Sequence, residues 1–226
     1  MIRMASESSC EPLMNAFSKT ALYAGRTDLP PLVARAVAIA NSFGFIHCCI
    51  PEQGALLQVL ARGWAGGIIG ETGTGCGAGL AWMASAVGPE TRLVSVEIDA
   101  TRAAACKALF ADLPNVTVLH GDWRLIEAYG PFDLLVLDGG GGGKRENDSP
   151  ADPAQLLKPA GVLVLDDFHP PMEFWPEESA PRDEYGRSTT EARKHWLQHP
   201  DLFAAEVRIH PQMSVILATR KAARAR

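Results

Sequence analysis

At 226 residues, the chain is long enough for one α/β domain with a proper core and short for two. Its formal net charge is -5, with 21 lysines and arginines against 26 acidic residues, and this acidic balance argues against nucleic acid as an obligate partner. No apolar run approaches the roughly 20 residues of a membrane span, and no basic start leads into a long apolar stretch, so we expect neither a membrane segment nor a signal peptide.

The beginning of the chain indicates a helical extension. Residues 1–30 are weakly patterned, and apolar side chains then recur at helical spacing. Pro51 suits the first turn of a further helix, which Gly63 can end. We interpret the chain as a single domain with three parts: a helical N-terminal extension over residues 1–50, a core over 51–220 and a basic tail over 221–226.

Strand-like and helix-like segments alternate through the core. The strand-like runs lie at residues 66–71, 92–97, 116–119, 132–138 and 161–167. This alternation predicts parallel strands joined by helical crossovers, and the nearly continuous apolar runs predict strands that are buried on both faces. Two last runs, 206–209 and 214–219, are too close for a crossover helix and should pair antiparallel.

Acidic residues mark the ends of these strands, where open parallel sheets bind their ligands. They are Glu71, Glu97, Asp122, Asp138 and Asp167. We therefore expect a binding site at the carboxyl edge of the sheet.

A glycine-rich turn follows the first strand and contains Gly73, Thr74, Gly75 and Gly77. Glycines let the backbone turn tightly and approach a ligand that a Cβ atom would block. The pattern also satisfies a loose dinucleotide fingerprint, but no Lys-Ser/Thr follows it, so it is not a P-loop. Glu97 can accept the ribose hydroxyls of either NAD or S-adenosylmethionine and does not discriminate between them.

Three features favour S-adenosylmethionine. Glu71 precedes the turn, where a carboxylate suits a cationic ammonium and sulfonium and is poorly placed beside a pyrophosphate. Gly121 and Asp122 offer an acceptor for an adenine amino group, with Trp123 as an apolar wall for the ring. The closing antiparallel hairpin is the third feature.

Taken together, the motifs resemble the class I S-adenosylmethionine-dependent methyltransferases. They are Glu-x-Gly-x-Gly-x-Gly at 71–77, Val-Glu-Ile-Asp at 96–99, Gly-Asp at 121–122, the strand ending in Asp138 and the strand ending in Asp166-Asp167. The segment Pro51-Glu52-Gln53-Gly54 is similar to one in the small O-methyltransferases related to catechol and caffeoyl-coenzyme A O-methyltransferase.

The resemblance implies a Rossmann-like, doubly wound α/β sheet of seven strands in the order 3-2-1-4-5-7-6, with strand 7 antiparallel. It also implies S-adenosylhomocysteine as product. Glu71 and the glycine turn would face the methionine part of the cofactor, and Asp138 would contact the cofactor as well. Glu97 and Ile98 would face the ribose, and Gly121, Asp122 and Trp123 the adenine.

The resemblance bears on metal binding too. The family usually holds a divalent ion through an Asp after strand four and an Asp-Asn pair after strand five. Asp138 and Asp167 match the acids, Phe168 stands in place of the Asn, and the family's lysine is displaced to Lys144. Neighbouring strand ends lie about 5 Å apart, so the two carboxylates need a cation, a shared proton or a positively charged ligand. Mg²⁺ on Asp138 and Asp167 is one solution.

Candidate bases are His169, Asp138 and Asp167, with His169 as the base if no metal is bound. Aromatic residues in the segment 168–187 favour a flat or apolar small-molecule acceptor, which the resemblance makes a hydroxyl. Two alternatives remain: an NAD-dependent oxidoreductase and a non-catalytic S-adenosylmethionine-binding module. Five cysteines without a C-x-x-C pair predict free thiols in the cytoplasm. The apolar N-terminal helices and the resemblance suggest a homodimer.

Overall fold

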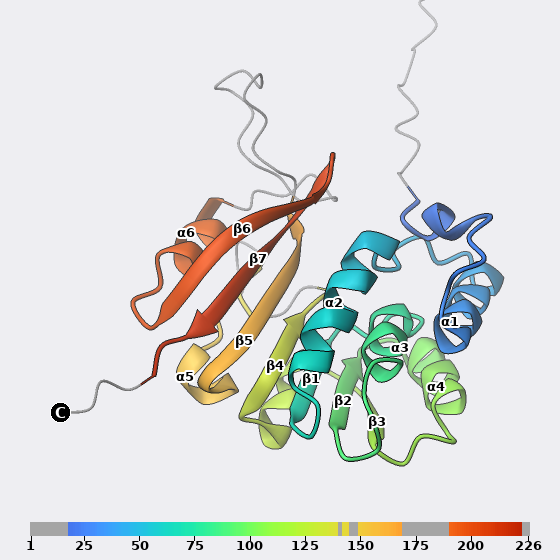
Figure 1. Ribbon diagram of the computed structural model, residues 1–226, viewed down its shortest axis with the longest axis horizontal. Coiled ribbons are helices and arrows are strands. Elements are labelled where there is room, and N and C mark those ends of the chain that lie inside the picture. The colour runs from blue at the N-terminus through green and yellow to red at the C-terminus, as the bar shows by residue number, and fades with distance from the viewer. Residues whose placement is uncertain (1–17, 140–141, 145–148, 169–189, 223–226) are drawn as a thin grey trace, which may run out of the picture.

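The computed structural model describes residues 18–139, 142–144, 149–168 and 190–222. Its strands form one seven-stranded mixed sheet (Figure 1). The strands are β1 (Ile68–Thr72), β2 (Arg92–Glu97), β3 (Val116–His120), β4 (Phe132–Leu137), β5 (Leu157–Phe168), β6 (Leu202–His210) and β7 (Met213–Arg220). Their order is β3-β2-β1-β4-β5-β7-β6, and β7 runs antiparallel to both its neighbours. The predicted fold class and strand order are confirmed.

Helices cover both faces of this sheet. One face packs against α1 (Pro31–Ser42), α2 (Pro51–Gly63), α3 (Ala78–Ala84) and α4 (Ala100–Leu109), which lie in front of or beside the sheet in Figure 1. The other face packs against η2 (Trp123–Tyr129), α5 (Pro153–Leu156) and α6 (Thr190–Leu197). A short helix, η1 (Thr20–Tyr23), precedes α1. No helix in the described ranges has the length and apolar character needed to cross a membrane.

The last strands differ most from the sequence expectation. β6 begins at Leu202 rather than at residue 206, and β5 begins at Leu157 rather than at residue 161. β6 is an edge strand in which the buried Leu202 is followed by interspersed exposed and half-buried positions, so it differs from the strands that are buried on both faces. Its extent is determined by pairing with β7, from Leu202 opposite Arg220 to His210 opposite Met213.

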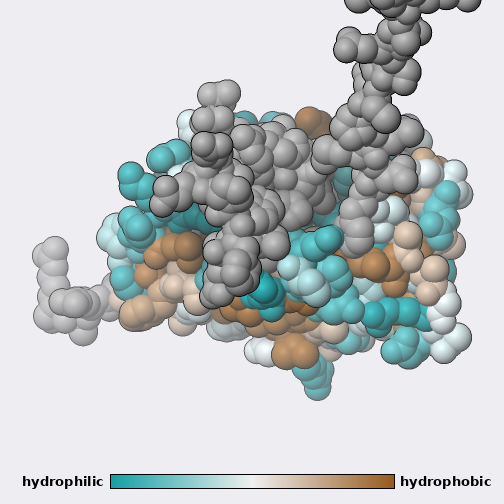
Figure 2. Space-filling model, turned by 90° about the horizontal axis from the view of Figure 1, so that it is seen from above, coloured by the Kyte–Doolittle hydropathy of each residue, from teal (hydrophilic) through white to brown (hydrophobic). Residues whose placement is uncertain are grey.

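The register of the parallel strands brings their carboxyl ends to one edge, at the top of Figure 1. Thr72 of β1 lies opposite both Val96 of β2 and Leu137 of β4, and Leu137 lies opposite Leu165 of β5. Residues that follow these positions are therefore neighbours in space. Figure 2 shows the molecule from this side, where hydrophilic and hydrophobic residues are interspersed over the described surface.

Gly54 provides a test of how α2 packs on α3. A Cβ atom at Gly54 would lie 2.1 Å from Trp82 Nε1, which itself donates to the Tyr23 hydroxyl at 3.0 Å. We expect Gly54→Ala to lower the free energy of unfolding by about 1–3 kcal/mol, because the buried indole must shift. Chemical denaturation measures this change.

The matched control is Gly63→Ala at the end of the same helix, where a Cβ atom would meet nothing within 4 Å. This variant should keep or slightly raise stability, since alanine favours helix over glycine. Equal stabilities of the two variants would contradict the packing argument.

Candidate functional site

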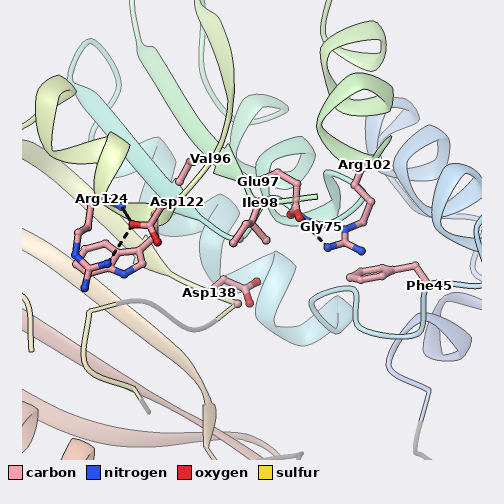
Figure 3. A pocket seen from close by; sticks show the side chains of 13 residues that line it. Phe45, Gly75, Val96, Glu97, Ile98, Arg102, Asp122, Arg124 and Asp138 are labelled. Atoms are coloured by element: carbon pink, nitrogen blue, oxygen red, sulfur yellow. Dashed lines mark hydrogen bonds and ion pairs between the residues drawn. The ribbon is translucent and has the colours of Figure 1, made fainter. Parts of the chain in front are cut away.

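A cavity of about 340 Å³ lies at the carboxyl edge, between the ends of β1, β2 and β4 and the start of η2 (Figure 3). Eight of the predicted cofactor residues line it: Gly73, Gly75, Glu97, Ile98, Gly121, Asp122, Trp123 and Asp138. Val96 and Gly139 also line it, as do Phe45, Arg102 and Arg124, and the last three were not singled out from the sequence. The size and mixed lining suit a small-molecule ligand.

The glycine turn forms one wall of this cavity. Gly73, Gly75 and Gly77 all have positive φ, between 56° and 89°, a conformation that favours glycine. A Cβ atom at Gly73 would lie 2.7 Å from the carbonyl oxygen of Asp138. The glycine at position 73 is therefore needed first for the close approach of the turn to the end of β4, whatever the ligand.

Three predicted cofactor residues, Glu71, Thr74 and Gly77, are not among those that line the cavity. Thr74 Oγ1 is 2.6 Å from Ser95 Oγ, and Ser95 Oγ donates to Glu71 Oε2 at 2.5 Å. The Glu71 residue is only 1% exposed, beneath the turn. Burial raises the pKa of Glu71 to about 8, the hydrogen bond from Ser95 opposes this rise, and the negative charges of Asp166 and Glu97 add to it.

Glu97 is held by donors from the chain itself. Its Oε2 accepts from the Gly75 backbone N–H at 2.7 Å. Its Oε1 accepts from the Asp99 N–H at 2.9 Å and from Arg102 Nε and Nη2 at 3.2 and 2.8 Å. The Arg102 guanidinium also lies 5.2 Å from the Phe45 ring centre (Figure 3). Oε2 thus retains acceptor capacity for a ligand, whereas Oε1 is engaged by Arg102.

Asp122, Trp123 and Arg124 form the opposite end of the cavity. The Asp122 carboxylate caps η2 by accepting from the Arg124 N–H at 3.0 Å and also pairs with Arg124 Nη1 at 3.2 Å. The Arg124 guanidinium lies 4.9 Å from the Trp123 ring centre. The Asp122 side chain is 55% exposed, so one face of this carboxylate is open to a ligand.

An acidic cluster adjoins the cavity. Ligand oxygens of Asp138, Asp166 and Asp167 all lie within 4.8 Å of one another, so Asp138 and Asp167 lie together as expected. Asp166 was missed, because adjacent residues of a regular strand point to opposite sides. Here Asp167 has a φ of 63°, and the pairing of β5 with β7 shifts register between Leu165 and Phe168, which brings both acids to one place. Phe168 is 2% exposed and packs into the core.

Two lysines enter this cluster. Lys144 Nζ donates to Asp166 Oδ1 at 2.6 Å, to Asp167 Oδ2 at 3.3 Å and to the Leu137 carbonyl at 3.1 Å. Lys19 Nζ donates to Asp167 Oδ1 at 2.8 Å. Gln53 Nε2, from the segment that resembles the O-methyltransferases, donates to Asp166 Oδ2 at 2.7 Å.

The members of the cluster differ in the direction in which their surroundings shift their pKa values. Burial disfavours charge on Asp167, but Lys144 and Lys19 outweigh it and lower its pKa below the ordinary value. Burial likewise opposes the charge on Lys144, but the three aspartates raise its pKa, so it remains an ammonium ion and is unsuited to act as a base. The pKa of Asp138 is raised well above its ordinary value by burial and by the charges of Asp166 and Asp167.

Asp138 is the member of the cluster that faces the cavity (Figure 3). Among the described residues, no hydrogen bond to its carboxylate is found, whereas both oxygens of Asp166 and of Asp167 accept one. His169, the other predicted base, lies outside the described residues, as does most of the segment 168–187.

Residues 71–168 match a family model described as a methyltransferase domain. This stretch contains the glycine turn, the cavity-lining strand ends and the acidic cluster. A curated protein of Mycolicibacterium paratuberculosis, provisionally named an O-methyltransferase, is 30% identical over 124 residues. The match covers 51% of this chain and 54% of the relative, so the chain spans about half the length of the curated relatives it matches.

Solved structures share the fold over most of the chain. The O-methyltransferase from Bacillus cereus in complex with SAH has a TM-score of 0.68 and is 19% identical, with 90% of this chain and 96% of that chain covered. The O-methyltransferase TomG from Streptomyces achromogenes, in complex with SAM, has a TM-score of 0.66 and is 19% identical, with the same coverage. The family match over residues 71–168 agrees with the resemblance to methyltransferases that the sequence motifs indicated, and the solved structures share the fold.

Glu71 predicts a pH dependence of stability. Its pKa is about 8 in the folded chain against an ordinary value of 4.5, so the folded state holds a proton that the unfolded state releases in that range. Stability should therefore fall as pH rises from about 4.5 to about 8. The Glu71→Gln variant lacks this titrating group, so its stability should fall less steeply as pH rises. Some of the fall should remain, because the raised pKa of Asp138 acts in the same direction.

Urea unfolding at a series of pH values measures this slope. Glu90→Gln, an exposed position just before β2, controls for the removal of a carboxylate as such. An unchanged slope in Glu71→Gln would show that Glu71 does not titrate in this range.

Proposed function

We propose that this chain, which carries a methyltransferase domain, transfers the methyl group of S-adenosylmethionine to a hydroxyl group of a small molecule. The observation that carries the proposal is the cavity at the carboxyl edge, which is lined by Glu97 at the end of β2, Asp122 after β3 and Asp138 after β4. Three acceptor groups at three successive strand ends fit a ligand with a ribose, a base amino group and a sulfonium. The family match and the shared fold support the same reading.

The nucleoside would lie along the cavity. Glu97 Oε2 would accept from the ribose hydroxyls, next to Ile98, and Asp122 would accept from the adenine amino group with the Trp123 ring beside it. Because Arg102 occupies Oε1, the ribose has to share the carboxylate with the guanidinium or displace it. The methionine part would then run past the glycine turn, above the buried Glu71.

The sulfonium would lie near Asp138, the carboxylate of the cluster that faces the cavity. In the transfer, the acceptor oxygen attacks the methyl carbon, an oxygen–carbon bond forms, and the carbon–sulfur bond breaks to leave S-adenosylhomocysteine. The hydroxyl proton passes to a base. Asp138 suits this role because its carboxylate faces the cavity, and its raised pKa makes it a stronger base than an ordinary aspartate.

Asp167 suits the role of base less well, since both its oxygens accept from ammonium groups and its pKa is lowered. His169 remains the alternative base. The enzyme's part is otherwise to align the acceptor with the methyl group, since the cofactor carries the reactive bond.

We also propose that the protein works in the cytoplasm as a homodimer. The four cysteines in the described ranges, Cys48, Cys49, Cys76 and Cys106, are free thiols, which suits a reducing compartment. Support for the homodimer comes from a groove between α1 and α4. Ile39, Phe43 and Leu109 are among the residues that line it, and Phe43 is 46% exposed. Light scattering that finds a monomer at micromolar concentration would contradict the dimer.

Cofactor binding tests the assignment of Glu97. We expect Glu97→Ala to weaken S-adenosylmethionine binding by about 1–3 kcal/mol, the range for losing charged hydrogen bonds. Isothermal titration calorimetry measures this, with Glu90→Ala as a control for loss of a carboxylate away from the cavity. If Glu97→Ala binds the cofactor like wild type, the ribose assignment is wrong.

Turnover tests the assignment of Asp138. Asp138→Asn should lower methyl transfer by about 10²–10⁴-fold, the usual contribution of general base catalysis, while cofactor affinity changes far less. Labelled methyl transfer to a panel of phenols, acids and amines measures the first quantity and calorimetry the second. Full activity in Asp138→Asn together with its loss in His169→Ala would assign the proton transfer to His169.

A further inference from the structure

The acidic cluster of Asp138, Asp166 and Asp167 is where the resemblance to the small O-methyltransferases implies a divalent cation. We propose that the ammonium groups of Lys19 and Lys144 take the place of that cation, so that the chain binds no divalent ion at this cluster and needs none for methyl transfer. The binding part of this inference is independent of the proposed function, and only its consequence for turnover rests on it.

Lys144 has the geometry of a resident counter-ion. An ammonium has three N–H donors, and those of Lys144 are matched by three acceptors: Asp166 Oδ1, Asp167 Oδ2 and the Leu137 carbonyl. The side chain is 8% exposed. Lys144 therefore has no donor left for a substrate, and it acts as a positioning residue that holds the two aspartates of β5.

Lys19 supplies a second charge from a distant part of the chain. It immediately precedes η1, lies 148 residues from Asp167 in sequence, and donates to Asp167 Oδ1 at 2.8 Å. The Lys19 side chain is 3% exposed. A lysine is rarely so buried unless it is paired, so this contact is a built feature of the site and not an incidental surface ion pair.

The carboxylate oxygens of the cluster suit these ammonium groups better than they suit a divalent ion. Mg²⁺ requires oxygen ligands in near-octahedral geometry. Both oxygens of Asp166 accept hydrogen bonds, from Lys144 and Gln53, and both oxygens of Asp167 accept them, from Lys19 and Lys144. Only the carboxylate of Asp138 is left without such a partner in the described residues, and a single carboxylate makes a poor site.

The charges lead to the same conclusion. Asp166 and Asp167 carry two negative charges that the two ammonium groups balance, so Asp138, whose raised pKa favours its protonated form, leaves at most one negative charge. A divalent ion would overcompensate this charge and would lie beside two ammonium groups that repel it.

Direct metal binding tests the inference. Wild-type protein is prepared with a chelator, which is then removed, and Mn²⁺ is titrated while free Mn²⁺ is followed by electron paramagnetic resonance. We expect no saturable binding below millimolar Mn²⁺ and no change in melting temperature with Mg²⁺. One Mn²⁺ bound per wild-type chain at micromolar concentration would overturn the proposal, whether or not any variant folds.

Lysine variants supply the positive result. In Lys144→Met, and more so in the Lys19→Met/Lys144→Met double variant, the aspartates lose their counter-ions. These variants should gain Mn²⁺ binding at least about tenfold tighter than wild type, because a repelling charge has been replaced by free carboxylate oxygens. Their melting temperatures should rise with added Mg²⁺. Folded variants that gain no Mn²⁺ affinity would contradict the role assigned to the lysines.

Lys158→Met is the matched control. Lys158 pairs with Asp133 at 2.7 Å at the opposite end of β4 and β5, so its loss should create no metal site. Turnover separates this inference from the proposed function. Chelator-resistant methyl transfer by wild type supports both, whereas transfer that needs added Mg²⁺ overturns the inference alone. Failure to bind S-adenosylmethionine would defeat the proposed function and leave the Mn²⁺ result as it stands.

Discussion

The carboxyl edge of the sheet gathers negative charges that the fold has to compensate. Glu71, Glu97, Asp138, Asp166 and Asp167 meet there, and all but Asp138 have side chains or whole residues that are less than a tenth exposed. A buried carboxylate needs a proton, a cation or a set of donors. The chain uses each of these: a raised pKa at Glu71, ammonium groups at Asp166 and Asp167, and backbone N–H groups with a guanidinium at Glu97.

These solutions connect segments that are far apart in sequence. Lys19 next to η1 and Gln53 of α2 both reach the end of β5, across 148 and 113 residues. The N-terminal helices are thereby attached to the site as well as to the sheet. Buried ion pairs contribute little net stability, because desolvation offsets their attraction, but removing one partner leaves an uncompensated charge. The cluster therefore matters more for holding the geometry of the edge than for the total stability of the fold.

The same arrangement separates roles among chemically identical side chains. Asp166 and Asp167 are saturated by donors, whereas Asp138 faces the cavity with a raised pKa. Three aspartates within a few ångströms thus divide into two that hold cations and one that is available to a ligand. Environment, and not residue type, assigns these functions.

The class of fold and several residues of the cavity could be predicted from the sequence. Strand-like and helix-like segments alternate along the sequence, and this alternation predicts the class of fold. The order of the motifs, through the family resemblance, implied the order of the strands. Glu97, Asp122 and Asp138 could be placed at the cavity because each lies at or just after the end of a strand, and the ends of parallel strands share one edge. Glu71 was expected at the same edge, yet it lies within β1, and its carboxylate is buried beside Gly79 of α3, where it accepts from Ser95.

The sequence could not show how the acids are compensated. Asp166 and Asp167 are adjacent and should point apart, and only the positive φ of Asp167 with the register shift beside it brings both into one cluster. No local sequence pattern indicates that Lys19 pairs with Asp167 or that Arg102 pairs with Glu97. Local sequence patterns are enough to place charged groups at the ends of strands. Which cation meets which carboxylate emerges only in the folded chain, because that pairing depends on distances across the fold that no local pattern encodes.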